Sequence, residues 1–133
     1  MTQTKSARQI VEKAYAAFLE RGDLDEFMEG FADDAELIEV ESLPYGGRFR
    51  GKDAIKGAMI HLASCWSDLS YVIHRIVDSE DCVMAHGTFA AKGAKSGKAV
   101  SFPLAEVWTV KNGQITELLA IYGDTKQVVD ALA

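Results

Sequence analysis

The chain has 133 residues, a formal net charge of −6 and 48% hydrophobic residues. This length and composition predict one globular domain over residues 1–133 with its own hydrophobic core. The acidic balance argues against nucleic acid as a partner, since phosphate binding needs a basic face. We also expect no membrane partner, because no apolar run approaches the ~20 residues that span a bilayer and residues 1–6 lack the apolar core of a signal peptide.

The first half of the chain has mainly the pattern of helices. Apolar residues such as Val11, Tyr15 and Phe18 recur at spacings of three and four, which predicts an amphipathic helix over residues 6–20. Asp23 predicts the start of a short second helix, with a capping-box pattern. We then expect a strand over 35–41, an irregular rim over 43–47, a short return strand over 48–50 and a helix over 53–65.

From about residue 69 the hydrophobic period changes to two, which predicts strands joined by short connections. Asn112-Gly113 is the strongest hairpin signal, because both residues tolerate positive φ. Asp124 predicts the cap of a last short helix. Helices followed by an antiparallel meander predict an α+β fold with helices against one face of a curved sheet. The expected strands of the meander cover residues 69–78, 82–92, 99–110 and 114–122.

The sequence has none of the common cofactor or metal motifs. Cys65 and Cys82 lack the CxxC spacing, so we expect two separate thiols and a reducing, cytoplasmic setting. The three histidines have neither HxH nor HExxH spacing, so no metal site is expected. Walker, GxGxxG and GxSxG motifs are missing as well, and we therefore expect no nucleotide cofactor and no serine hydrolase.

Glu106 is the residue that points most directly to a functional site. It lies in the predicted strand over residues 100–110, on a face whose other members are large and apolar. A carboxylate in such a row is costly unless it is paired, protonated or facing a cavity. We interpret Glu106 as a residue that lines a ligand cavity. The alternative is a structural glutamate bonded to a buried histidine or tyrosine.

Five short segments follow one another in a characteristic order: Gly22-Asp23-Leu24, Phe31 to Ala35, Pro44 to Gly47, Gly51 to Ile55 and Val107 to Ile115. In order and spacing they resemble the nuclear transport factor two-like superfamily, most of all its SnoaL-like and ketosteroid isomerase-like members. The resemblance implies a cone-shaped domain, in which a strongly curved, mostly antiparallel sheet carries three to four helices on its concave face over an apolar cavity. It also implies a homodimer that forms through the outer face of the sheet.

The resemblance further implies three catalytic positions. Ketosteroid isomerases use a tyrosine on the first helix, a general base on the first strand and an acid on a later strand, and these positions fall on Tyr15, Glu39 and Glu106. Glu39 would then be the base, with Tyr15 and a protonated Glu106 donating to the developing enolate oxygen. Both acidic positions are aspartates in those enzymes and glutamates here. Because ~1 Å of misplacement can cost ~10²-fold in rate, this difference argues against steroid isomerisation itself.

Each of these residues has a simpler interpretation. Glu39 is followed by apolar Val40 and flanked by other acids, so a surface charge is the alternative, and Tyr15 also fits a core tyrosine with a satisfied hydroxyl. His74 and His86 are candidate cavity residues that act as acid or base, or else structural histidines. The aromatic residues suit either a pocket for a flat apolar molecule or plain core packing; they are Tyr45, Phe49, Trp66, Phe102 and Trp108.

Three functions are compatible with this pattern. The first is a cofactor-free acid–base enzyme, of the isomerase, cyclase, hydratase or dehydratase type, that acts on an apolar carbonyl-bearing substrate. The second is a non-catalytic domain that binds a small molecule in the same cavity. The third is a structural dimerisation module whose core is filled. The sequence does not name the ligand.

Overall fold

The computed structural model describes residues 5–133 and contains helices, strands and one short π-helix. The helical segments are α1 (Ala7–Tyr15), the π-helix η1 (Ala16–Glu20), α2 (Leu24–Glu29), α3 (Lys52–Cys65) and α4 (Thr125–Leu132). The strands are β1 (Phe31–Glu39), β2 (Gly47–Arg50), β3 (Trp66–Ser79), β4 (Cys82–Gly93), β5 (Ala99–Lys111) and β6 (Gln114–Tyr122).

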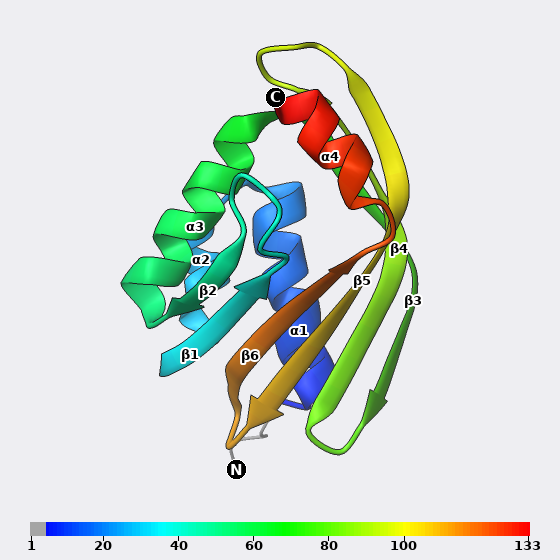
Figure 1. Cartoon of the computed structure of the whole chain (residues 1–133). Coiled ribbons are helices and arrows are strands. Elements are labelled where there is room, and N and C mark those ends of the chain that lie inside the picture. Colours follow the sequence, from blue (N-terminus) through cyan, green and yellow to red (C-terminus); the bar gives the residue numbers. More distant parts are fainter. Residues whose placement is uncertain (1–4) are drawn as a thin grey trace.

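The described strands form one sheet in the order β2-β1-β6-β5-β4-β3. All neighbouring strands are antiparallel except β1 and β6, which are parallel. Figure 1 shows that the sheet is curved and that α1 and α3 lie on its concave side, with α4 near one end. Helix α1 packs on β3 to β6, α3 packs on β1 to β3, and α4 packs on β4 and β5. The predicted α+β fold with a curved sheet is therefore confirmed.

The helix starts have the side-chain caps that the sequence indicates. The Asp23 carboxylate accepts a hydrogen bond from the Glu26 backbone N–H at 3.0 Å, and Asp124 accepts from Gln127 at 3.2 Å. Such caps satisfy N–H groups that have no partner inside the helix. The predicted turn between β5 and β6 is also confirmed, because Asn112 and Gly113 both have positive φ, at 53° and 76°.

Two strands begin several residues earlier than the sequence predicts. Strand β1 begins at Phe31 rather than at residue 35, although Asp33 and Asp34 are exposed and break the alternation of buried residues. The pairing of β1 with β6 is irregular at this point, between Phe31 and Glu36. Strand β3 begins at Trp66, directly after α3, rather than at residue 69. Both strands are extended by sheet pairing, which the local pattern does not reveal.

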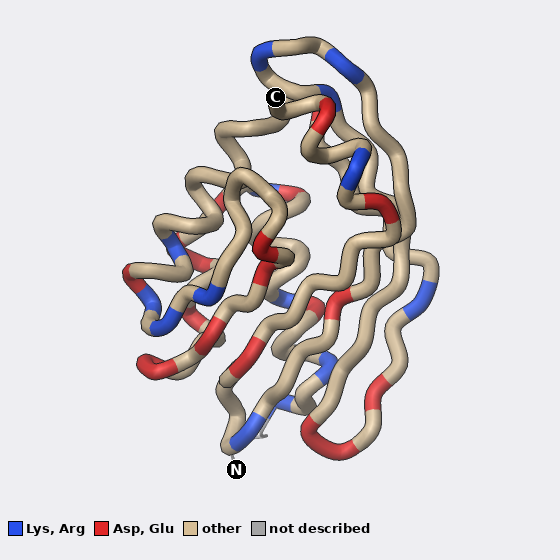
Figure 2. The backbone as a smooth tube through the Cα atoms, viewed as in Figure 1, with Lys and Arg blue, Asp and Glu red and all other residues tan. Residues whose placement is uncertain are grey.

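The hydrophobic core lies between the helices and the concave face of the sheet. On β5 the inward residues are those that the alternation predicts, with Leu104 and Trp108 buried on either side of Glu106. Figure 2 shows that acidic residues gather along β1, whereas lysines gather on the loop between β4 and β5. In the part of the chain that the structure describes, we find no helix that is both long and apolar enough to cross a membrane.

Candidate functional site

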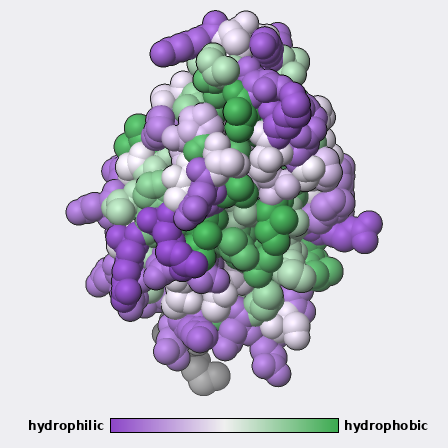
Figure 3. Space-filling view, in the orientation of Figure 1, coloured by the Kyte–Doolittle hydropathy of each residue, from purple (hydrophilic) through white to green (hydrophobic). Residues whose placement is uncertain are grey.

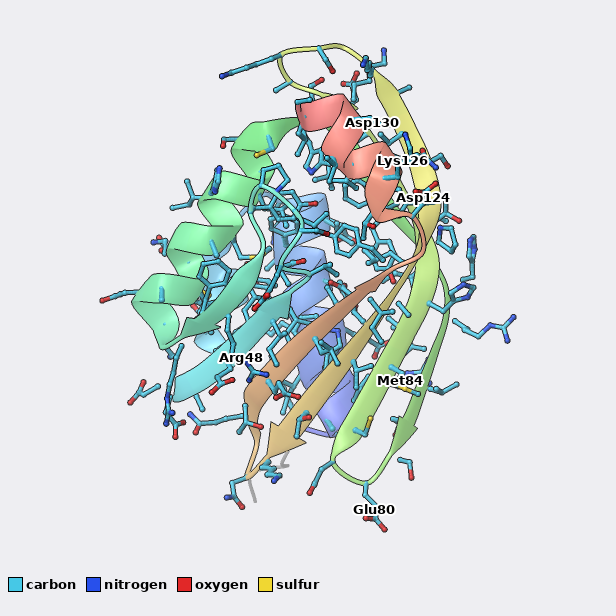
Figure 4. All side chains as sticks on the ribbon, in the orientation of Figure 1. Arg48, Glu80, Met84, Asp124, Lys126 and Asp130 are labelled. Atoms are coloured by element: carbon cyan, nitrogen blue, oxygen red, sulfur yellow. The ribbon has the colours of Figure 1, made fainter. Side chains whose placement is uncertain are left out.

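A small cavity of about 50 Å³ lies between the helices and the concave face of the sheet. Its wall consists of aromatic and aliphatic side chains together with two glutamates, Glu39 from β1 and Glu106 from β5. No lysine, arginine or histidine is among the described residues that line it. Figure 4 shows how densely side chains fill the space between the helices and the sheet. The volume is well below the ~300–1,000 Å³ of drug-sized ligand pockets.

Glu106 is the end of a directed chain of hydrogen bonds. The Trp108 indole Nε1–H donates to the Tyr15 hydroxyl at 2.8 Å, and the Tyr15 hydroxyl donates to Glu106 Oε1 at 2.7 Å. An indole N–H can only donate, so the Tyr15 oxygen is the acceptor there and its own hydrogen is free for Glu106. Tyr15 therefore holds the Glu106 carboxylate in place as a hydrogen-bond acceptor. Glu106 keeps some accessible surface, because it borders the cavity.

Glu39 has a different environment. Only 5% of the residue is exposed, and its Oε2 atom is buried without a hydrogen-bond partner among the described residues. The Tyr122 hydroxyl on the neighbouring strand β6 is the polar group that favours its charged form. Tyr122 is itself bonded to the Tyr45 hydroxyl, with 2.8 Å between the two oxygens. An unpartnered buried carboxyl oxygen is costly in its charged form, which favours the protonated acid.

Burial raises the pKa values of both glutamates toward neutral pH. Desolvation, with repulsion from Glu106 as a second cause, raises the pKa of Glu39 to about 8. Desolvation raises the pKa of Glu106 to about 7, while the hydrogen bond from Tyr15 opposes the rise. The two carboxyls thus titrate as an interacting pair. Above a pH of about 7 the pair therefore carries negative charge, and Glu39 is the more strongly protonated member.

The other hydroxyl groups of the cavity wall are already engaged. The Tyr71 hydroxyl from β3 donates to the Leu104 backbone carbonyl at 2.8 Å. Burial raises the pKa of Tyr15, Tyr71 and Tyr122, so these phenols stay neutral. Gly87 makes room for the Tyr71 ring, because a Cβ at this position would lie 2.8 Å from Tyr71 Cε1 and 2.3 Å from the Val72 carbonyl oxygen.

The structure brings the three predicted catalytic residues, Tyr15, Glu39 and Glu106, to one cavity. Among the predicted ligand-binding aromatics, Trp108 also lines it. The others pack beside the cavity as core residues. Phe102 stacks between Phe89 and Tyr122, Trp66 packs edge-on against Phe89, Tyr45 binds Tyr122, and Phe49 is partly buried against the core.

The prediction that His74 and His86 line the cavity is wrong. Both are exposed on the outer face of the sheet, and His74 Nε2 lies 2.8 Å from the Thr88 hydroxyl. On β4 the buried residues Val83 and Ala85 occupy the inward positions, so His86 must point outward. On β3 a register shift after Ile73 breaks the simple alternation. Neither histidine is therefore available to the two carboxyls.

Two tyrosines of the cavity wall, Tyr71 and Tyr122, were not among the predicted site residues. Tyr122 shares its strand face with Leu118 and Ala120, both buried. The alternation along this strand therefore indicates that Tyr122 faces the core. Tyr71 gave a weaker signal, because β3 departs from strict alternation around it. Among residues 5–133, no three histidine, cysteine, aspartate or glutamate side chains gather in a way that would hold a metal ion.

Comparisons with known proteins agree with this architecture. The family model of the SnoaL-like domain matches residues 11–118. An uncharacterised protein of Mycobacterium tuberculosis is 29% identical over 86% of this chain and 87% of its own length. A crystal structure of an NTF2-like protein from Burkholderia thailandensis is 27% identical, covers 97% of this chain and 98% of its own, and superposes with a TM-score of 0.89.

A second similar structure was crystallised together with a small molecule. The protein TerC, co-crystallised with polyporic acid, is 21% identical, covers 95% of this chain and 97% of its own, and has a TM-score of 0.83. At this identity the likeness shows the fold alone.

Proposed function

Because this chain belongs to the family of SnoaL-like domains, we propose that it is a cofactor-free enzyme that transfers protons on a small organic molecule. The observation that carries the proposal is a pair of glutamates on one small apolar cavity, one unpartnered and one held as an acceptor. Acid–base catalysts work best with pKa values near the working pH, and burial places both carboxyls there. The reaction would be of the isomerase, cyclase, hydratase or dehydratase type on an apolar carbonyl-bearing substrate.

The hydrogen bonds favour a division of roles opposite to the one expected from the sequence. Glu106 receives a hydrogen bond from Tyr15 and is more readily ionised, so it is the member available to accept a proton. Glu39 is more readily protonated because of its burial, so it is the member available to donate one. In the proposed step, Glu106 takes a proton from the carbon beside the substrate carbonyl while Glu39 gives its proton to the carbonyl oxygen. The products are an enol, a protonated Glu106 and a Glu39 carboxylate, and protonation at another carbon completes an isomerisation.

Solvent deuterium exchange tests this proposal without knowledge of the natural substrate. Small ketones and enones incubated with the protein in D₂O should gain deuterium beside the carbonyl, as followed by NMR. Glu39→Gln and Glu106→Gln should each slow the exchange by ~10²- to 10⁴-fold. Glu117→Gln is the matched control, since Glu117 lies on β6 and points to the outer face with its neighbour Glu36. Exchange at wild-type rates in both cavity variants would refute the proposal.

A second candidate is non-catalytic binding of a small molecule in the same cavity. TerC, which shares the fold, binds a small organic molecule in its crystal, and the cavity wall here is mostly apolar and aromatic. Binding alone predicts a ligand that stabilises the protein against heat and gains no deuterium. A ligand at 100 times its dissociation constant should add ~2.7 kcal/mol to the free energy of unfolding.

We further propose that the protein forms a homodimer through the outer face of the sheet. Apolar side chains on this face are exposed, among them Val72, Val77, Met84 and Ile121. Figure 3 shows a continuous hydrophobic area over the middle of this side of the molecule. Contiguous apolar surface of this kind marks an interaction site in soluble proteins. A two-fold axis would bring the same patch of both copies together.

A further inference from the structure

The free hydrogen-bonding groups of the cavity are almost all acceptors. Trp108 gives its N–H to Tyr15, Tyr15 gives its hydroxyl hydrogen to Glu106, and Tyr71 gives its own to a backbone carbonyl. Glu106 Oε2 receives no hydrogen bond from the described residues, and Glu39 Oε2 is buried without a partner. The wall therefore presents free carboxyl oxygens to a ligand, whereas most of its N–H and O–H donors are already bonded within the protein.

The charge of the cavity also favours a ligand that donates hydrogen bonds, namely a cation. With one proton between them the two glutamates carry one negative charge, and no basic side chain lies among the described residues of the wall to balance it. A buried uncompensated charge is costly. An anionic ligand would add a second negative charge to this site, whereas a cation would neutralise it. Aromatic rings occupy much of the remaining wall, and their faces attract cations.

We propose that the cavity selects a small organic cation that carries N–H groups, such as a protonated amine, over neutral or anionic molecules of the same shape. This inference goes beyond the proposed function, because it names a ligand class other than the carbonyl-bearing substrate for the same cavity. Glu106 Oε2 accepts the N–H hydrogen bond, which is strengthened by the opposite charges. The volume of about 50 Å³ restricts the ligand to a few non-hydrogen atoms unless side chains move.

The pH dependence of binding follows from the groups that face Glu106. These are Tyr15 from α1, Glu39 from β1, Tyr71 from β3 and Tyr122 from β6. The tyrosines stay neutral because burial raises their pKa values. Below a pH of about 7, where Glu106 takes up a proton, the affinity for the cation should fall by about tenfold per pH unit.

The test compares ethylamine, ethanol and acetate, which are similar in shape and differ in charge. Each is titrated into the full-length protein near pH 8 while the Trp108 indole N–H signal is followed by NMR, because this group adjoins the cavity. Ethylamine should bind about ten- to a hundredfold more tightly than ethanol, since its hydrogen bond to a carboxylate is between charges. Acetate should bind most weakly.

Two near-isosteric variants show whether the preference for ethylamine arises at Glu106. Glu106→Gln should remove the preference for ethylamine over ethanol, while the outer-face variant Glu117→Gln should keep it. Equal affinities for ethylamine and ethanol in the wild-type protein, or an ethylamine preference that survives in Glu106→Gln, would overturn the inference. Absence of binding by all three compounds would overturn it as well. Deuterium exchange into ketones decides the proposed function separately, so either claim can fail while the other stands.

Discussion

Glu39 and Glu106 are the same residue type on the same cavity, yet their hydrogen bonds differ. Glu106 is fixed by a donor chain from Trp108 through Tyr15, whereas Glu39 has a buried oxygen without a partner among residues 5–133. In the proposed function, environment rather than residue type thus separates an acid from a base, as it does in enzymes with paired carboxyls. The consequences at the scale of single residues are changes in stability and in pH dependence.

We predict that the protein becomes less stable as the pH rises from about 4.5 to about 8. The ordinary pKa of a glutamate is 4.5, and in the folded protein it is raised to about 8 for Glu39 and about 7 for Glu106. Between these values the folded state binds more protons than the unfolded state, so its extra stability is complete below 4.5 and is lost as the pH rises. Urea denaturation across this range measures the change, which is on the order of a few kcal/mol.

Glu39→Gln should weaken this pH dependence and make the protein more stable than wild type near pH 9, because the buried carboxylate is replaced by a neutral amide. Glu117→Gln on the outer face should leave the slope as it is. A free energy of unfolding that is constant or rising between pH 5 and 8 would contradict the assignment of raised pKa values to this pair.

Tyr15→Phe should affect both stability and the pH profile of catalysis. The change leaves the Trp108 N–H without its acceptor and Glu106 without its donor, at a cost of about 1–3 kcal/mol. Since the Tyr15 hydrogen bond lowers the pKa of Glu106, its loss should move the acidic limb of the exchange profile, which reports the proposed base, to higher pH. Tyr71→Phe, which removes a hydrogen bond to a backbone carbonyl instead, should destabilise the protein and leave the profile in place.

The sequence predicted which way a side chain faces where hydrophobic residues recur with the regular period of a strand or a helix. Glu106 faces inward because β5 alternates regularly, and Tyr15 lies on the buried stripe of α1. The partners of their polar atoms were not predictable, because the Tyr15–Glu106 hydrogen bond joins residues 91 positions apart. The proposed reversal of roles between Glu39 and Glu106 rests on that one contact and on the burial of Glu39.

At the scale of elements, β3 and β4 decide which residues reach the cavity. The sequence pattern of β4 gives the alternation but not its direction, so His86 was assigned to the wrong face. The register shift after Ile73 adds an irregularity to β3 that no local signal marked. The parallel pairing of β1 with β6, which are far apart in the chain, could not be predicted from the local sequence either. Strand order depends on contacts between distant segments.

His86→Ala and His74→Ala should therefore leave deuterium exchange and ligand affinity within about twofold of wild type, because both rings are exposed on the outer face. Substitutions of exposed residues usually change stability by no more than ~0.5 kcal/mol. The exchange assay and the thermal shift described above measure both quantities. A loss comparable to that of Glu106→Gln would show that one of these strands packs differently in solution.

At the scale of the whole molecule, the outer face of the sheet is the surface through which we propose that the homodimer forms. Met84 on β4 and Val77 on β3 form a cross-strand pair there and are 43% and 52% exposed. Figure 4 places Met84 on the side of the sheet away from α1. The helices cover the opposite face, so the two faces of one sheet would serve separate tasks, ligand binding and self-association.

Met84→Lys should shift the protein from dimer to monomer, because a charge in an apolar interface is costly to desolvate. Sedimentation velocity at several protein concentrations measures the shift. Ile60→Lys is the matched control, since Ile60 is 52% exposed on α3 and lies away from the sheet's outer face. A monomeric wild-type protein, or equal effects of the two variants, would count against the dimer.

The π-helical turn η1 at Ala16–Glu20 lets the first helical segment hold one extra residue without displacing the site. A π-helical turn accommodates one residue more than an α-helical turn, and such turns are frequent at functional sites. Deleting a single residue within it would let α1 continue as a regular α-helix while the segments on both sides keep their positions. The Tyr15 hydroxyl would then stay within reach of Glu106. A homologue whose first helix is one residue shorter should therefore keep its tyrosine at the carboxyl and have no π-helical turn.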